Sequence, residues 1–131
     1  MPGSRSSGLP PQSANPKIHI AMLELEKTFR KENIEEPVEA VFKPAVNKTR
    51  IESYGAEMLI TASKVYLLPN APEDQERYNP LCIGISEIAG CKKYGLFGFG
   101  FELTDGSRQL FSNVGKKMRE GITAAIEARK K

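Results

Sequence analysis

The sequence predicts a mainly β fold of the α+β class: a bent antiparallel sheet or partly open barrel of about seven strands, capped by a C-terminal α-helix. Three observations predict it. Large apolar residues alternate along one segment, as on one face of a strand: Phe97, Phe99, Phe101 and Leu103. The Asp105-Gly106 pair that follows is typical of a tight hairpin turn. An amphipathic segment after Asn113 then supplies an apolar face that can cover the phenylalanines.

Composition places the chain among soluble globular domains. Its 131 residues suit one domain with one core, and 40% are hydrophobic and 27% charged. No apolar run is long enough to span a bilayer, and the first residues lack the apolar stretch of a secretory signal, so we expect a cytoplasmic protein. Residues 1–15, rich in Gly, Ser and Pro with Arg5 as their one charge, predict a disordered tail that is either native or a remnant of expression.

An amphipathic helix is predicted at 16–33. Asn15 can cap it, and Pro16 suits its first turn, where a missing N–H costs nothing. Its apolar residues recur at spacings of four, three and four, which puts them on one stripe: Ile18, Met22, Leu25 and Phe29.

The domain proper is predicted at 37–131. A first strand is expected at 38–42, and two more are expected within 55–69 around a turn near Thr61. The proline-rich stretch 69–80 predicts an exposed loop, and 81–95 predicts one or two strands with a bend near Gly90.

The last helix begins near Ser112 or Asn113, either of which could cap it. Its predicted apolar face consists of Val114, Met118, Ile122, Ala125 and Ile126. Six Lys or Arg and two Glu from Asn113 onward give this segment a larger positive excess than the whole chain, whose net charge is +3. Such a helix could meet an acidic partner or an anionic bilayer, although a solvated face is the commoner explanation.

Four segments together resemble the pleckstrin-homology (PH) superfold, and within it the GRAM branch. They are GAEMLITASKVYLLP (55–69), CIGISEIAGCKK (82–93), FGFGFELTDGSRQLFS (97–112) and NVGKKMREGITAAIEARKK (113–131). The resemblance is one of hydrophobicity and turns, covers about residues 38–131, and implies a non-enzymatic binding or interaction module. The N-terminal helix at 16–33 departs from the family core.

The residues themselves argue against catalysis. The single histidine, His19, has no Cys or second His beside it, so neither a nucleophilic triad nor a metal site is expected, and no cofactor is implied. Cys82 and Cys91 lie among apolar neighbours and are expected to be buried free thiols.

An anion-binding or lipid-binding site is the sharper alternative. Lys43, Lys48 and Arg50 lie close together in a predicted loop, and in PH relatives such a basic loop is associated with phosphoinositide headgroups. Arg can hold phosphate with two hydrogen bonds while Lys adds a point charge. Lys92 and Lys93 would add charge if their strand end lies nearby.

For partners, we expect a protein or a second copy of the chain, since an open sheet presents edges that accept an added strand. An anionic membrane lipid is the alternative, which would make the protein peripheral to a membrane. Nucleic acid is disfavoured because the basic stretches are not interleaved with exposed aromatics.

Overall fold

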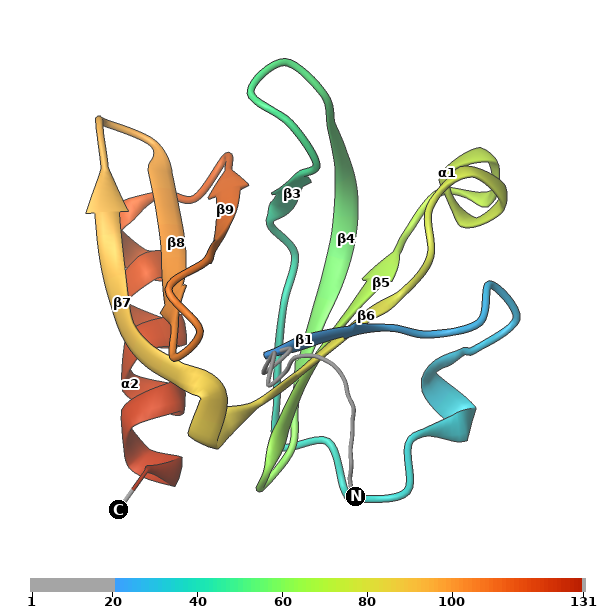
Figure 1. Cartoon of the computed structure of the whole chain (residues 1–131), viewed down its shortest axis with the longest axis horizontal. Coiled ribbons are helices and arrows are strands. Elements are labelled where there is room, and N and C mark those ends of the chain that lie inside the picture. Colours follow the sequence, from blue (N-terminus) through green and yellow to red (C-terminus); the bar gives the residue numbers. More distant parts are fainter. Residues whose placement is uncertain (1–20, 131) are drawn as a thin grey trace, which may run out of the picture.

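The computed structural model describes residues 21–130, in which nine strands form one antiparallel sheet and a 14-residue helix packs against it (Figure 1). The predicted tail at 1–15 and the first part of the predicted helix at 16–33 lie outside the described residues. The strands are β1 (Met22–Glu24), β2 (Ala40–Phe42), β3 (Ala45–Asn47), β4 (Ser53–Ile60), β5 (Lys64–Pro69), β6 (Leu81–Gly84), β7 (Ile88–Tyr94), β8 (Gly98–Leu103) and β9 (Arg108–Ser112). The helices are α1 (Pro72–Arg77) and α2 (Lys116–Arg129), with 3-10 turns at Lys31–Asn33 and Ile85–Glu87.

The strand order is β1-β6-β5-β4-β3-β9-β8-β7, with β2 also paired to β4. Within the described residues β1 and β7 form the two ends of this order and do not pair with each other, so the sheet is bent but not closed into a barrel. The predicted architecture is therefore confirmed. The strands outnumber the predicted seven because the N-terminal segment adds β1, and because Pro44 separates β2 from β3.

The core lies between the inner face of the sheet and α2. Phe101 is fully buried, and its ring meets that of Phe111 edge-on at 5.1 Å and that of Phe99 at 6.0 Å. From α2, Ile122 and Ile126 enter the same cluster. The predicted cover of the phenylalanines by the last helix is thus present. Burial of each large side chain contributes about 1.5–3 kcal/mol, which makes α2 an integral part of the domain.

Phe97 is a correction to the predicted apolar face, because its side chain is 67% exposed. Tyr94 pairs with Gly98 across the β7–β8 hairpin, so residues 95–97 form the turn and β8 begins only at Gly98. Gly95 has a φ of +64°, a left-handed conformation that suits glycine in a tight turn. The alternation therefore continues inward for Phe99, Phe101 and Leu103 alone.

Because the glycines of β8 lack side chains, neighbouring residues pack closely against that face of the strand, as predicted. A Cβ atom on Gly100 would lie 2.8 Å from Leu110 Cδ2 and 3.1 Å from Tyr94 Cε2. A Cβ atom on Gly98 would overlap the carbonyl oxygen of Tyr94. Both positions therefore favour a residue without a side chain.

The helix predicted at 16–33 is wrong over the described residues. Met22–Glu24 is a strand that pairs with β6, and Leu25 N–H donates to Pro80 O at 2.7 Å. Phe29 stacks on Tyr66 with 5.6 Å between ring centroids. The apolar residues are spaced as in a helix, but Met22 packs against the main core, whereas Leu25 and Phe29 cover a second apolar cluster on the outer face of β4, β5 and β6. That cluster consists of Leu59, Tyr66, Leu68 and Cys82, covered by Leu25, Phe29, Ile34 and Val38.

Two smaller expectations also change. The stretch predicted as an exposed loop contains α1, which begins at Pro72 in its first turn and is followed by the buried Tyr78. The last helix starts at Lys116 rather than near Asn113, and its N-cap residue Gly115 offers no side-chain cap. Asn113 instead adopts a φ of +62° in the connection. Within residues 21–130, no helix is long and apolar enough to cross a bilayer.

Candidate functional site

The predicted basic residues occupy three places in the structure. Lys43 follows β2, Lys48 and Arg50 lie in the β3–β4 loop, and Lys92 and Lys93 lie in β7; all five are exposed. In the strand order β3-β9-β8-β7, the lysines of β7 are three strands away from the loop that carries Lys48. The predicted single basic loop is a correction: β3 (Ala45–Asn47) separates Lys43 from Lys48, so only Lys48 and Arg50 share a loop, and Lys92 and Lys93 lie apart from it on β7.

The β3–β4 loop has a defined turn. Lys48 N–H and Thr49 N–H donate to Glu52 O at 2.8 and 3.1 Å. The Thr49 hydroxyl accepts from Ile51 N–H at 3.3 Å and from Glu52 N–H at 3.0 Å. These bonds hold Ile51 at the tip of the loop, where it is 95% exposed.

A stack of side chains supports the base of this loop. Tyr54 of β4 stacks on Tyr78 with 4.1 Å between centroids, and Lys48 Nζ lies 5.7 Å from the Tyr78 ring centroid. The Tyr78 hydroxyl donates to the Glu52 carboxylate. Lys48, Tyr54 and Tyr78 also line a recess of about 180 Å³. Lys48 is therefore held over an aromatic ring, while Arg50 beside Ile51 makes no side-chain ion pair within the described residues.

The buried phenol of Tyr54 predicts that the domain loses stability at high pH. Burial raises its pKa to about 12, above its ordinary value of about 10. The protonated phenol therefore stabilises the fold fully below pH 10, and this contribution is lost as the pH rises toward 12, by about 2–3 kcal/mol. We expect the free energy of unfolding, measured in urea at pH 8 and pH 11, to fall more in the wild type than in Tyr54→Phe. Equal losses of unfolding free energy in the wild type and in Tyr54→Phe would contradict the raised pKa of Tyr54.

The β7–β8 loop carries a second pair of exposed apolar side chains. Leu96 is 79% exposed and Phe97 67% exposed. Val114 N–H donates to Phe97 O at 3.2 Å, which ties this loop to the start of α2. The exposed Lys116 and Lys117 follow directly, so cations border the apolar turn.

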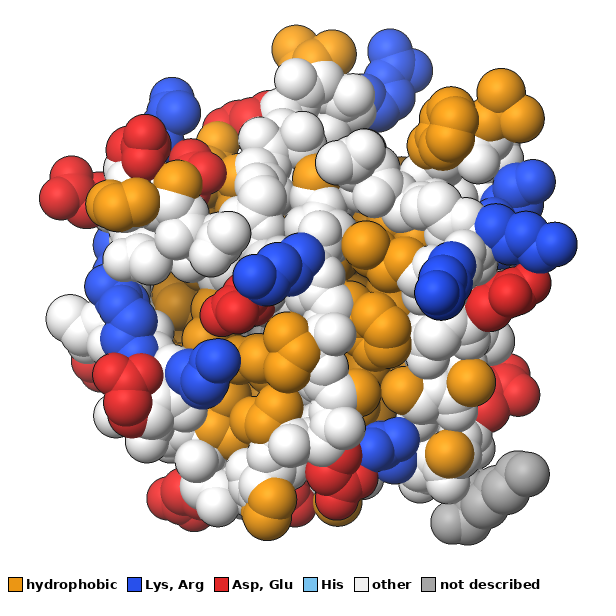
Figure 2. All heavy atoms as spheres, turned by 180° about the vertical axis from the view of Figure 1, so that it is seen from behind, with side chains coloured by type: hydrophobic (Ala, Val, Ile, Leu, Met, Phe, Trp, Pro, Cys, Tyr) orange, Lys and Arg blue, Asp and Glu red, His pale blue; other side chains and the backbone are white. Residues whose placement is uncertain are grey.

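The two loops lie at the same end of the molecule (Figure 1). Seen from behind, that upper edge shows protruding hydrophobic side chains with Lys and Arg side chains beside them (Figure 2). We call the surface formed by residues 48–52, 95–97 and 114–117 the loop end. It combines three exposed large apolar side chains with four cations, and it faces away from the bulk of the core. Its apolar members are Ile51, Leu96 and Phe97, and its cations are Lys48, Arg50, Lys116 and Lys117.

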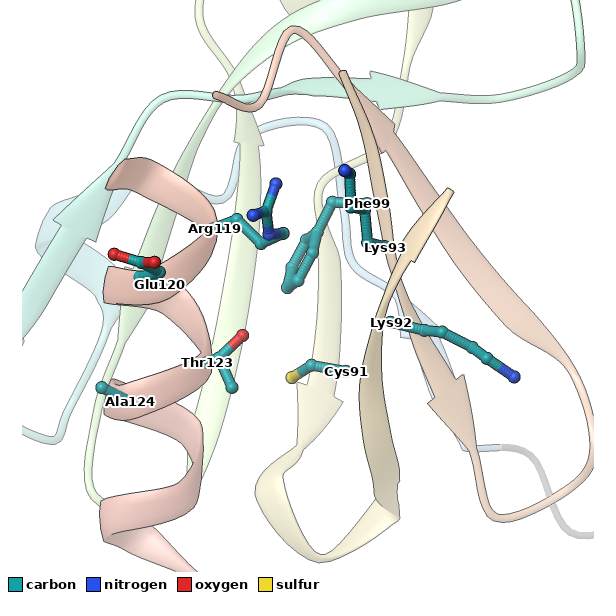
Figure 3. Close-up of a pocket in the computed structure, with 8 residues that line it drawn as sticks. All are labelled: Cys91, Lys92, Lys93, Phe99, Arg119, Glu120, Thr123 and Ala124. Carbon is teal, nitrogen blue, oxygen red and sulfur yellow. The ribbon is translucent and has the colours of Figure 1, made fainter. Parts of the chain in front are cut away.

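A groove of about 460 Å³ runs between β7 and α2 (Figure 3). Lys93 and Arg119 point into its upper part beside the Phe99 ring, and Thr123 faces Cys91 further along. Burial raises the pKa of the Cys91 thiol to about 11, so the thiol is protonated at neutral pH. Both cysteines are free thiols; Cys82 is buried as predicted, whereas Cys91 is only partly buried.

Lys92 points away from this groove and pairs with Glu102 at 3.4 Å. Antiparallel pairing explains the difference, because Lys93 lies opposite the inward-facing Phe99 and Lys92 lies opposite Gly100. The side chains of these two consecutive lysines therefore lie on opposite faces of the sheet.

Sequence reasoning missed the apolar residues of the loop end and Arg119. A usable signal was present for the first group, because Ile51 is flanked by Arg50 and Glu52, and Leu96 follows a glycine at a hairpin turn. Apolar residues in such turns have no core to enter. Within the described residues, no cluster of three or more His, Cys, Asp or Glu side chains is arranged to hold a metal ion.

No protein-family model matches the chain, and no curated protein matches it. Solved structures do. The chain is similar over 72% of its length to the crystal structure of an N-terminally truncated form of the linker-DH/PH domains of p115-RhoGEF, with a TM-score of 0.59 and 11% identity. The fold is PH-like.

A second structure, the DH/PH domains of a p115-RhoGEF mutant, matches over 70% of the chain with a TM-score of 0.54 and 14% identity. In each case the PH-like chain described here covers 29% of the longer chain. At these identities the likeness concerns the fold alone, and it agrees with the antiparallel sheet and C-terminal helix seen in Figure 1.

Proposed function

We propose that this chain is a non-enzymatic PH-like binding module that docks on an anionic membrane surface through its loop end, as a cytoplasmic protein peripheral to the membrane. The observation that carries the proposal is the exposure of Ile51, Leu96 and Phe97 beside cations at one end of the molecule. A GRAM-type assignment is part of the proposal, supported by the strand and hairpin order of residues 82–112.

Physical magnitudes favour the interaction. Large apolar side chains left in water forgo about 1.5–3 kcal/mol each, and the boundary between headgroups and acyl chains offers them burial without a protein partner. Each Lys or Arg near an anionic surface adds about 1 kcal/mol. Three apolar side chains and four cations thus suffice for reversible binding, whereas either group alone would give weak attachment.

The arrangement of the apolar residues favours a membrane over a folded protein as the partner. Ile51 stands on one loop, and Leu96 and Phe97 stand on another, so they form separate protrusions rather than one flat patch. A fluid bilayer accommodates separate protrusions, because its lipids rearrange around each of them. The cations beside each loop would contact lipid phosphates, with Arg50 suited to a bidentate contact.

The acidic helix α1 supports a specific orientation. It carries Glu73, Asp74 and Glu76 and lies on the opposite side of the β3–β4 loop from the β7–β8 loop (Figure 1). An anionic surface repels these carboxylates. The module is therefore proposed to tilt toward the β7–β8 loop and the start of α2, away from α1.

Vesicle sedimentation tests the proposal. Vesicles of phosphatidylcholine alone are compared with vesicles that also contain phosphatidylserine or a phosphoinositide. We expect the wild type to bind only the anionic vesicles, with affinity that falls as salt rises. The triple variant Ile51→Ser/Leu96→Ser/Phe97→Ser should lose at least tenfold in affinity, and Lys48→Ala/Arg50→Ala a comparable amount.

The chain provides a matched control. Leu23 and Val41 are also exposed apolar residues, at 55% and 45%, but they lie on β1 and β2 outside the loop end. Leu23→Ser/Val41→Ser should bind vesicles as the wild type does. The proposal fails if the wild type does not bind anionic vesicles, or if the control variant loses as much affinity as the loop-end variant. Preference for the phosphoinositide over an equal charge of phosphatidylserine would identify a specific headgroup site.

A further inference from the structure

We propose that Thr49 is a phosphorylation site, and that a phosphate on its hydroxyl releases the loop end from an anionic membrane. The inference rests on the proposed function, because it concerns the control of that same surface. Three features of Thr49 carry it: the accessibility of the loop, the hydrogen bonds that its side chain accepts, and the charges on either side of it.

The first feature is accessibility. Residues 48–53 are all exposed, and the β3–β4 loop extends beyond the ends of its two strands at the top of Figure 1. No side chain of this stretch belongs to either apolar cluster of the domain. The loop can therefore open locally and enter the active site of a kinase without exposing the core.

The second feature is a side-chain geometry that accommodates a phosphate. Thr49 Oγ1 accepts from Ile51 N–H at 3.3 Å and from Glu52 N–H at 3.0 Å, so two backbone donors already point at this side chain. Both bonds use the oxygen as acceptor and leave the hydroxyl proton uncommitted to them. Successive backbone N–H groups in a turn also bind phosphate oxygens, so the loop can keep its turn after modification.

The third feature is charge. Lys48 and Arg50 flank Thr49 directly, and with Glu52 they give residues 48–52 a net charge of +1. A phosphate adds about −1.5 to −2 at neutral pH and makes this net charge negative. Arg50 would then pair with the phosphate of its own loop in place of a lipid phosphate. Anionic lipids would repel the remaining negative charge.

The neighbouring hydroxyls lack this arrangement. Within the residues that define the loop end, Thr49 carries the only hydroxyl side chain. Ser53 is exposed, but it begins β4 opposite Asn47 and has no cation on either side of it in the sequence. The hydroxyl of Ser112 donates to Asn47 Oδ1 at 2.6 Å in a partly buried position. The geometry therefore selects Thr49 among them.

The reaction is transfer of the γ-phosphoryl group of ATP by a separate kinase. The bond between Thr49 Oγ1 and phosphorus forms, the bond between the γ-phosphorus and the bridging oxygen breaks, ADP leaves, and the hydroxyl proton passes to a carboxylate of the kinase. The cations beside Thr49 predict a kinase whose substrate cleft is acidic. Hydrolysis of the ester by a phosphatase restores the free hydroxyl.

Kinase assays on the folded full chain test the modification. The chain is incubated with ATP and a panel of purified serine/threonine kinases that are selective for basic substrates, and the products are mapped by mass spectrometry. We expect Thr49 to be modified at least tenfold faster than any other hydroxyl of residues 21–130. Thr49→Val should abolish this product. Lys48→Ala/Arg50→Ala should slow it at least tenfold, because the kinase reads these cations.

Vesicle sedimentation tests the consequence. The chain is produced with a phosphate on Thr49, and a control chain carries a phosphate on the exposed Ser86. Ser86 belongs to the 3-10 turn Ile85–Glu87, which lies at the opposite end of the molecule from the loop end (Figure 1). The phosphate on Thr49 should weaken binding to vesicles that contain phosphatidylserine at least tenfold, and phosphatase treatment should restore it. The phosphate on Ser86 should leave binding unchanged, because salt screens its charge over that distance.

Four results would overturn the inference. They are no modification of Thr49 by any kinase of the panel, equal rates in Lys48→Ala/Arg50→Ala and wild type, unchanged vesicle binding with a phosphate on Thr49, or equal weakening by a phosphate on Ser86. Thermal melts verify that both phosphorylated chains are folded. A chain that fails to bind anionic vesicles before modification overturns the proposed function as well. A chain that binds equally well before and after modification overturns this inference alone.

Discussion

Phe101→Asp is expected to abolish cooperative unfolding, whereas Phe97→Asp, four positions earlier in the same hairpin, should leave it intact. Phe101 is fully buried between the rings of Phe99 and Phe111. Loss of a buried phenylalanine costs about 3–5 kcal/mol, and burial of an unpaired carboxylate costs more. Together these approach or exceed the total stability of about 5–15 kcal/mol that is typical of a domain.

The measurement is urea denaturation followed by circular dichroism. Phe97 is 67% exposed, so Phe97→Asp introduces the same charge at a position where water solvates it, and the expected change is within about 0.5 kcal/mol. A cooperative transition in Phe101→Asp, or a severe loss in Phe97→Asp, would contradict the assignment of these two residues to core and turn.

Gly98→Ala is expected to destabilise the domain by about 3 kcal/mol, the upper end of what overpacking usually costs. The new methyl group would overlap the Tyr94 carbonyl oxygen, which belongs to the backbone and cannot rotate away. Gly90→Ala, on the neighbouring strand β7, is the matched control because a Cβ atom there meets nothing within 4 Å. Comparison of the two midpoints of urea denaturation measures the difference. Similar midpoints would show that the hairpin backbone shifts to accept the methyl group.

The phenylalanine alternation and the terminal helix could be predicted because each depends on local period. A two-residue repeat in β8 and a three-to-four-residue repeat in α2 predict which faces are buried without knowledge of the partner element. The prediction failed at Phe97 because the position of the hairpin turn decides where the strand begins. Turn position depends on the register of β7 and β8, which a repeat within one strand does not contain.

The N-terminal segment shows a different limit. Met22, Leu25 and Phe29 are spaced as in a helix, yet Met22 packs against the main core from strand β1, while Leu25 and Phe29 cover the outer face of the sheet as irregular chain. The relevant signal was in β5, where the continuous apolar run Val65–Leu68 predicts a strand covered on both faces. That signal indicates that a cover exists, but not which segment provides it, because the contact joins distant parts of the chain.

The basic residues of the candidate site could be predicted from the sequence, but which of them lie together in the fold could not. Lys48 and Arg50 are two positions apart in the sequence and lie in the same loop of the structure. The separation of Lys92 from Lys93 follows from strand alternation, but the proximity of Lys93 to Arg119 depends on how α2 packs across β7. Such proximity is a tertiary property and has no counterpart in local spacing.

The covering of the outer sheet face by residues 25–38 has a practical consequence for the boundaries of the domain. A fragment beginning at Pro37, where the PH-like part was expected to start, would leave Tyr66, Leu68 and Cys82 largely in contact with water. Three neighbouring apolar side chains on an uncovered sheet face favour association between molecules. A fragment that keeps the outer face of the sheet covered therefore has to include residues 25–38, most of which precede the start expected for the PH-like part.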